Sequence, residues 1–187
     1  SKTRYFASGN YFDQKGVLLA SDYKRYNGRL NLDQQVSDRI SIGANIVVSN
    51  SLANNTVTNG RYENGGIVTA AIYWSPDVPL RDDKSGYPIS PYYAVIPNPL
   101  SYETVTDLTK TNRVLTSAYG EWKIIEGLKA KANFSYDQSN AKRSNYFPRT
   151  FLYGSQSNGA ASISQSESQS KLFEYTLNYD KNISELH

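Results

Sequence analysis

Cysteine, methionine and long apolar runs are missing from this chain of 187 residues, and the one histidine is the terminal His187. Without cysteine there is no disulfide scaffold, no thiolate metal site and no cysteine nucleophile. A single terminal histidine does not supply the positioned imidazole of a Ser-His-Asp triad or the ligands of a zinc cluster. We therefore expect no enzyme activity, no metal site and no cofactor.

No window holds 18 consecutive apolar residues, which excludes a transmembrane helix. Transmembrane strands are not excluded, because half of their positions face a polar lumen. The formal net charge is +3, with both signs interspersed and no basic run, so nucleic acid is not an expected partner. No initiating methionine and no apolar leader open the chain, and we expect an internal segment of a longer protein.

Two alternating stretches between Arg25 and Val48 organise the rest of the sequence. Apolar residues of the first alternate with polar ones, and so do those of the second: Tyr26, Gly28, Leu30 and Leu32, then Ile40, Ile42, Ala44, Ile46 and Val48. A period of two puts the apolar side chains of a strand on one face. The short polar connection at 35–39 predicts an antiparallel hairpin. A soluble sheet shows the same alternation, so this hairpin alone leaves a membrane and a soluble interpretation open.

The same alternation predicts an all-β, antiparallel up-and-down arrangement of about six strands. We place these strands near residues 3–14, 24–36, 39–50, 113–125, 128–138 and 170–181. Two long loops are predicted at 50–112 and 139–168. Six of the seven prolines lie between Pro76 and Pro99, which excludes a central strand there because proline cannot donate to a ladder. Periodicity leaves open whether 65–74 is a short helix or a buried strand.

Connections alternate in length, with short turns near 36–39, 126–127 and 181–184 and longer segments between them. The apolar faces of the second to sixth strands carry no charge, and a Lys or Arg at the lipid midplane costs roughly 2–4 kcal/mol. Both observations predict a transmembrane β-barrel segment in the outer membrane, with its two long loops extracellular. Six strands leave two open edges, which bilayer hydrocarbon does not permit, so the remaining strands come from a longer protein.

Aromatic residues are the first binding candidates. The 16 tyrosines fit an aromatic girdle, a sugar-stacking surface or plain β-propensity. Five loop aromatics either contact substrate or a partner or pack the loop against itself: Trp74, Tyr87, Tyr92, Tyr93 and Tyr102. The polar strand faces give a second group, predicted to face the lumen or a plug: Arg25, Arg29, Asp33, Lys129, Lys131 and Asp137. The pair Asp82-Asp83 lacks EF-hand spacing, which favours a solvated turn over a calcium site.

Several motifs resemble the barrel of SusC/RagA-type TonB-dependent outer-membrane transporters. They are SGNYFDQKG (8–16), SDYKRYNGRLNLD (21–33), IxIGAN (40–45), WSPDVP (74–79), NP (98–99), NR (112–113), IIEGLK (124–129) and FEYTLNYD (173–180). The resemblance implies a plugged 22-strand barrel in the outer membrane that works with a SusD-like surface lipoprotein acting as a lid. It also implies import of oligosaccharides or peptides, driven by the TonB complex through an N-terminal plug and TonB box that lie outside this sequence.

Two alternatives remain beside this interpretation. One is a soluble β-rich glycan-binding or adhesin domain, and the other is an outer-membrane barrel without transport function. Dependence on detergent separates the first alternative from a membrane barrel, and a plug and TonB box elsewhere in the full protein separate the second.

Overall fold

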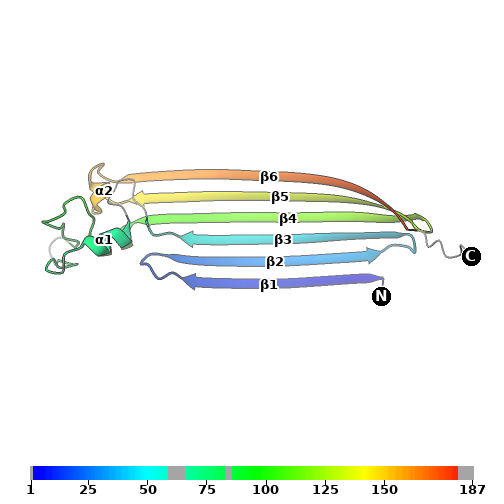
Figure 1. Ribbon diagram of the computed structural model, residues 1–187, viewed down its shortest axis with the longest axis horizontal. Coiled ribbons are helices and arrows are strands. Elements are labelled where there is room, and N and C mark those ends of the chain that lie inside the picture. The colour runs from blue at the N-terminus through cyan, green and yellow to red at the C-terminus, as the bar shows by residue number, and fades with distance from the viewer. Residues whose placement is uncertain (1, 59–65, 83–85, 181–187) are drawn as a thin grey trace, which may run out of the picture.

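The computed structural model describes residues 2–58, 66–82 and 86–180. Six strands form one antiparallel sheet in which each strand pairs with its neighbours in sequence (Figure 1). The strands are β1 Thr3–Lys15, β2 Asp22–Gln35, β3 Ile40–Asn54, β4 Thr106–Ile125, β5 Leu128–Phe147 and β6 Ala160–Tyr179. This order confirms the all-β, antiparallel up-and-down class predicted from the alternation.

The later strands are longer than the alternation predicts, because β4, β5 and β6 each contain 20 residues. The loop predicted at 139–168 is wrong in its bounds. Pairing of β5 with β6 continues from Ser139 opposite Ser168 to Phe147 opposite Ala160. Likewise, β3 runs to Asn54 and β4 begins at Thr106, so the loop predicted at 50–112 is shorter at both ends. Backbone groups pair whatever side chains they carry, whereas alternation marks only the part of a strand with one apolar face.

The tight turns lie at one end of the sheet and the long connections at the other (Figure 1). The β2–β3 and β4–β5 turns fall at 36–39 and 126–127, as the sequence predicts. Gly127 has φ 81°, a conformation that glycine adopts at little cost, and the register shifts between Lys123 and Ile125 beside it. The third predicted turn, at 181–184, lies outside the described residues.

The described parts of the loops carry three short helical segments, α1 Ile67–Tyr73, the 3-10 helix η1 Pro99–Thr104 and α2 Leu152–Ser155. The stretch 65–74 therefore holds a helix, which begins after Gly66 with φ 112° and ends at the extended Trp74. No helix in the described part of the chain is long and apolar enough to cross a membrane.

The buried apolar cluster of the described residues lies in the loops and not on the sheet. It contains Ile67, Ala70, Ile96, Tyr102, Val105 and Phe151. Leu18 from the β1–β2 connection and Phe147 from the end of β5 pack against it, so the cluster joins three connections. On the sheet, by contrast, Leu30 is 47% exposed and Leu177 is 67% exposed. None of the described elements covers either face of the sheet.

Candidate functional site

The strand register assigns each sheet residue to one of two faces, because directly opposite residues point to the same side. Ala7, Leu30 and Ile46 lie in one row, which defines the apolar face. Asp33, Gly43 and Tyr119 lie in another row, which defines the polar face. The six residues predicted from the polar strand faces all share this face: Arg25, Arg29, Asp33, Lys129, Lys131 and Asp137. Their contact with a lumen or plug stays a prediction.

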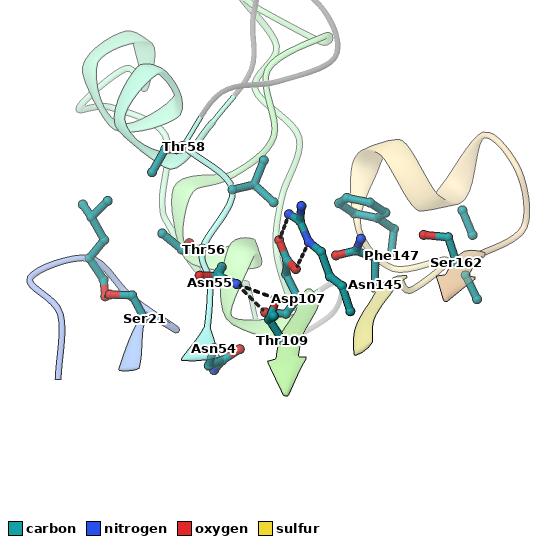
Figure 2. Close-up of a pocket in the computed structure, with 15 residues that line it drawn as sticks. Ser21, Asn54, Asn55, Thr56, Thr58, Asp107, Thr109, Asn145, Phe147 and Ser162 are labelled. Carbon is teal, nitrogen blue, oxygen red and sulfur yellow. Dashed lines mark hydrogen bonds and ion pairs between the residues drawn. The ribbon is translucent and has the colours of Figure 1, made fainter. Parts of the chain in front are cut away.

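A hollow of about 930 Å³ opens where the polar face meets the loops (Figure 2). Arg143 of β5 donates two hydrogen bonds to Asp107 of β4, from Nε to Oδ1 at 2.7 Å and from Nη2 to Oδ2 at 2.6 Å. The Asp107 side chain is only 6% exposed, whereas the Arg143 side chain is 52% exposed. Among the described lining residues, Asp107 and Arg143 are the only charged ones, and they neutralise each other.

The remaining polar lining of the hollow consists of amides and hydroxyls. It includes Asn54, Asn55, Thr56, Thr109, Asn145 and Ser162. Asn55 Nδ2 donates to the Thr109 hydroxyl at 3.3 Å, while the buried Thr56 hydroxyl has no hydrogen-bond partner among the described residues. Because amides and hydroxyls both donate and accept, this surface suits a neutral polar molecule such as a sugar or a peptide backbone.

Three arginines line a second hollow of about 340 Å³ on the polar face, nearer the middle of the sheet. Arg113 donates to both carboxylate oxygens of Asp137, at 2.9 Å and 2.6 Å. Arg29 donates from Nε to Asn31 Oδ1 at 3.1 Å. Among the described residues, Arg25 and Arg29 form no ion pair, so this hollow keeps positive charge.

Asp33 and Lys131 meet at a single ring. The Tyr119 hydroxyl donates to Asp33 Oδ1 at 2.7 Å, and Lys131 Nζ lies 4.6 Å from the centroid of the Tyr119 ring. Two of the residues predicted to line a lumen, on β2 and β5, are therefore held by Tyr119 on β4. These contacts position their charges on the polar face near the turn end of the sheet.

The sequence analysis names Tyr102 as a binding candidate, and the structure contradicts this because Tyr102 is buried. Its ring is 1% exposed and packs edge-on against Phe151, with ring centroids 5.1 Å apart. Its hydroxyl accepts a hydrogen bond from the Gly66 backbone at 3.2 Å. Burial raises the pKa of Tyr102 to about 12. Tyr102 therefore packs the loop against itself, as the second alternative for the loop aromatics predicts.

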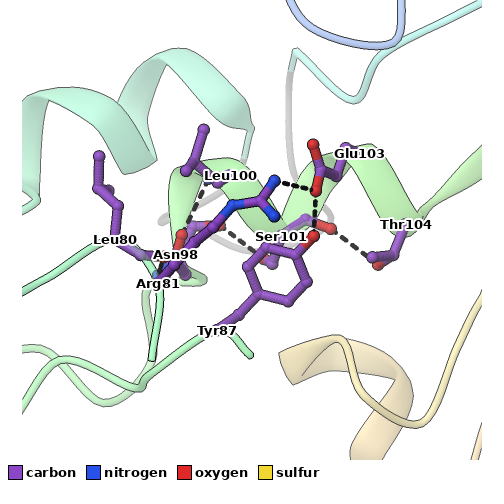
Figure 3. Close-up of polar contacts among 8 residues, drawn as sticks. All are labelled: Leu80, Arg81, Tyr87, Asn98, Leu100, Ser101, Glu103 and Thr104. Atoms are coloured by element: carbon purple, nitrogen blue, oxygen red, sulfur yellow. Dashed lines mark hydrogen bonds and ion pairs between the residues drawn. The ribbon is translucent and has the colours of Figure 1, made fainter. Parts of the chain in front are cut away.

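Tyr87 lies over a small polar cluster beside η1 (Figure 3). Its hydroxyl donates to the Glu103 carboxylate, which also accepts from Arg81 Nη2 at 2.6 Å. The hydrogen bond to Glu103 raises the pKa of Tyr87. The NP motif lies in the same cluster, where Asn98 Nδ2 donates to the Leu80 carbonyl at 2.9 Å and Asn98 Oδ1 accepts from Leu100 N at 2.9 Å. Asn98 thereby caps η1 and ties it to the preceding loop.

The other predicted aromatics lie at the loop surface. Tyr92 is 60% exposed, and its hydroxyl donates to Asp77 Oδ2 at 2.6 Å. This bond raises the pKa of Tyr92, while the pKa of Asp77 is lowered by hydrogen bonds from Ser75 and Tyr92. Tyr93 is 48% exposed and meets Tyr73 edge-on at 6.0 Å. Trp74 is half-buried and donates from Nε1 to the Val78 carbonyl at 3.0 Å.

Sequence reasoning missed Asp107, Arg143 and Tyr119 as site residues. Asp107 and Arg143 fall in stretches that the sequence predicts as loops, although both lie in strands. Asp107 and Arg143 continue the polar face of Arg113 and Asp137, but the opposite face is also polar in these stretches, so alternation gives no signal there. No sequence signal indicates that Tyr119 reaches over its neighbouring strand.

Comparison with known proteins gives one consistent result, although no family model matches. The chain is 27% identical over 183 residues to TonB-dependent receptor P3 of Formosa agariphila, covering 96% of this chain and 18% of that receptor. It is 27% identical over 192 residues to TonB-dependent receptor P26 of the same organism. The chain resembles a segment of a TonB-dependent receptor. It spans about a fifth of the length of these TonB-dependent receptors.

Solved structures support the same fold. A chain of the RagAB peptide transporter superposes with a TM-score of 0.76 at 22% identity, covering 99% of this chain and 21% of that chain. The RagAB peptide importer in its 'closed-closed' state superposes with a TM-score of 0.77 at 23% identity. The predicted resemblance to SusC/RagA-type TonB-dependent receptors is thereby confirmed. The similar proteins are receptors and transporters, not enzymes.

Proposed function

We propose that this chain is a wall segment of a TonB-dependent outer-membrane barrel that imports oligosaccharides or peptides. One observation carries the proposal. An uncharged band of the apolar face runs through Ala7, Leu30, Ile46 and Ala132, and no described element covers it. An uncovered apolar face of this size in water is an aggregation hazard, but it is what lipid requires of a barrel exterior.

The polar face then lines the lumen, where the proteins of similar sequence and fold suggest a polar cargo. The hollow at Asp107 and Arg143 presents amides and hydroxyls, and its ion pair adds no net charge. Both a sugar and a peptide backbone offer the complementary donors and acceptors. The second hollow, which contains Arg25 and Arg29 and lies nearer the middle of the sheet, faces either the cargo or a plug. The comparisons give no support for the alternative of a soluble glycan-binding or adhesin domain.

A SusD-like surface lipoprotein is the partner that we propose for the loop end. Tyr92 and Tyr93 are exposed there, beside the exposed Ile72 and Tyr73 of α1. Tyrosine is typical of residues that dominate the energy of protein interfaces. Energy from TonB enters through parts of the protein outside this chain. In this arrangement the loops are extracellular and the turns are periplasmic.

Uptake by whole cells tests the transport proposal. A strain that lacks the intact receptor is complemented with wild type, with Asn145→Trp or with Asn140→Trp, and given labelled oligosaccharides and peptides. Asn145 lines the hollow, whereas Asn140 lies five residues earlier on the same strand and points to the opposite face. We expect Asn145→Trp to reduce uptake and Asn140→Trp to leave it unchanged. Uptake that survives deletion of the receptor itself would overturn the proposal.

A further inference from the structure

The apolar face changes character toward the loop side of the sheet. Its continuous run of apolar residues ends at Val48 on β3, Val114 on β4, Tyr136 on β5 and Phe173 on β6. Beyond them the same face carries mainly amides and charges, with Leu52, Leu108, Tyr146 and Ile163 interspersed. We call its polar residues the polar extension: Asn50, Lys110, Asn112, Gln138, Asn140, Lys142, Glu167, Gln169 and Lys171. Gln169 Nε2 donates to the Tyr136 hydroxyl at 2.6 Å, at the boundary itself. If the apolar part lies in lipid, the polar extension begins where the hydrocarbon ends.

Two lysines face each other in the polar extension. Lys110 of β4 and Lys142 of β5 are directly opposite in the register, and both are exposed. Directly opposite residues have Cβ atoms about 4.5–5.5 Å apart, and like charges at that spacing are destabilising. Within the described part of the chain, no carboxylate lies within ion-pair distance of either ammonium group. The pair is therefore an unneutralised point of positive charge.

Neighbouring charges do not neutralise Lys110 and Lys142. Asp107 lies three residues before Lys110, and Arg143 directly follows Lys142, but both point to the polar face, where they bind each other. Glu167 is the one carboxylate of the polar extension on β4, β5 and β6, and it accepts from Gln138 Nε2 at 2.9 Å. A third cation, Lys171 of β6, lies nearer the boundary, with Nζ 6.0 Å from the centroid of the Tyr136 ring. Three lysines against one glutamate leave this surface positive.

The height of these cations above the apolar residues matches a headgroup layer. Lys110 lies four residues beyond Val114, which is about 13 Å along a strand at about 3.3 Å per residue. A barrel strand tilts by about 40°, so the height above the hydrocarbon is about 10 Å. Lysine side chains can also extend back toward the hydrocarbon along an apolar surface. Lys171, two residues beyond Phe173, lies lower, at the hydrocarbon edge.

We propose that Lys110, Lys142 and Lys171 bind the phosphate groups of a glycolipid in the outer leaflet of the membrane. Charge complementarity identifies the occupant, because an anion between two opposed ammonium groups turns their repulsion into attraction. A glycolipid is anchored by its acyl chains against the apolar residues below, which holds its phosphates at this height. The inference rests on the proposed function, since it needs the apolar face in lipid and the loops outside the cell.

Binding of lipid A to the intact receptor in detergent tests the proposal. The double variant Lys110→Gln/Lys142→Gln is compared with Lys123→Gln/Lys129→Gln, because Lys123 and Lys129 form the same opposed pair between the same strands on the polar face. We expect about thirtyfold weaker binding of bisphosphorylated lipid A for the first variant, since it removes two basic residues and each contributes about 1 kcal/mol near a membrane surface. Lys171→Gln alone should show a smaller loss, and the control variant should bind like wild type.

Three outcomes would overturn the lipid site. They are equal binding by the two double variants, equal binding of dephosphorylated lipid A, and full displacement of lipid A by millimolar inorganic phosphate. A cysteine at Ser157, labelled from outside the cell, reports the topology independently. If Ser157 is accessible and lipid binding is unchanged, the lipid site alone fails. If Ser157 is not accessible from outside, both the lipid site and the proposed orientation fail.

Discussion

Tyr119 of β4 donates a hydrogen bond to Asp33 of β2 across the whole width of β3, with 2.7 Å between the two oxygens. The ring crosses β3 at Gly43, where an added Cβ would collide with the ring carbons of Tyr119. Lys131 of β5 lies over the same ring. One tyrosine thus connects four neighbouring strands. Because a slip of one residue would turn Tyr119 to the opposite face, this contact favours the observed register.

Filling the space above Gly43 tests this arrangement. Gly43→Ala should lower the free energy of unfolding by about 1–3 kcal/mol, the usual cost of overpacking. Gly120→Ala is the matched control, because an added Cβ there meets nothing within 4 Å. The heat-modifiable folded fraction of the intact receptor in detergent measures both variants. If the two alanine substitutions lower the free energy of unfolding equally, the position of the Tyr119 ring does not depend on the missing side chain of Gly43.

The facing of the sheet is tested by two neighbouring residues of β5. Ala132 lies on the apolar face and Lys131 on the polar face. Ala132→Arg should cost roughly 2–4 kcal/mol or block assembly, because it puts a cation into lipid. Lys131→Ala should be far milder, since its position is wet or faces a plug. If both changes are tolerated equally, or if Lys131→Ala is worse, the faces are inverted or the sheet is not in a membrane.

The two arginine–aspartate pairs between β4 and β5 differ in burial and should differ in energy. Arg143→Ala leaves Asp107, at 6% exposure, without its partner and should cost about 1–3 kcal/mol. Arg113→Ala leaves Asp137, at 31% exposure, in contact with water and should cost clearly less, because solvent screens an exposed ion pair. Unfolding of both variants in urea measures the difference. A larger loss for Arg113→Ala would contradict this ranking.

Thiol labelling of whole cells decides the orientation. Cysteines at Asn55 and Ser157, both exposed at the loop end, should react with an impermeant reagent. A cysteine at Ser37, in the β2–β3 turn, should not react in intact cells. Because the Ser37 hydroxyl accepts bonds from two backbone amides, the exposed Asp38 serves as a second turn position. Cell lysis should make both turn cysteines reactive, and the reverse pattern in intact cells would overturn the topology.

The loop cluster should weaken in strong alkali through Tyr102. Burial raises the pKa of Tyr102 to about 12, whereas an unfolded tyrosine titrates near 10. The unfolded state therefore loses this proton first. The stability that the neutral hydroxyl contributes is complete below pH 10 and is lost as the pH rises from about 10 to about 12. The tyrosinate absorbance of wild type minus Tyr102→Phe should rise near pH 12, and a rise near pH 10 would show that Tyr102 is exposed.

The sequence by itself determined the sheet, its faces and the two turns that the structure describes. Period-two alternation separates Leu30 from Arg29 and Ala132 from Lys131 without any knowledge of partners, because the pleat alone assigns the side. Gly127 marks a turn because its backbone angle suits glycine. The motifs also sufficed to indicate a TonB-dependent receptor, since they are spread in order over nearly the whole chain.

Only the tertiary structure decided where the strands end and what the polar residues do. Serines and amides fill both faces of β6 beyond Phe173, so no pattern separates a polar strand from a loop there, although the backbone ladder continues to Ala160. The pairing of Asp107 with Arg143 joins residues 36 positions apart, and the register that brings them together depends on every pair below them. Burial of Tyr102 depends on Phe151 from another loop, and local sequence carries no trace of that contact.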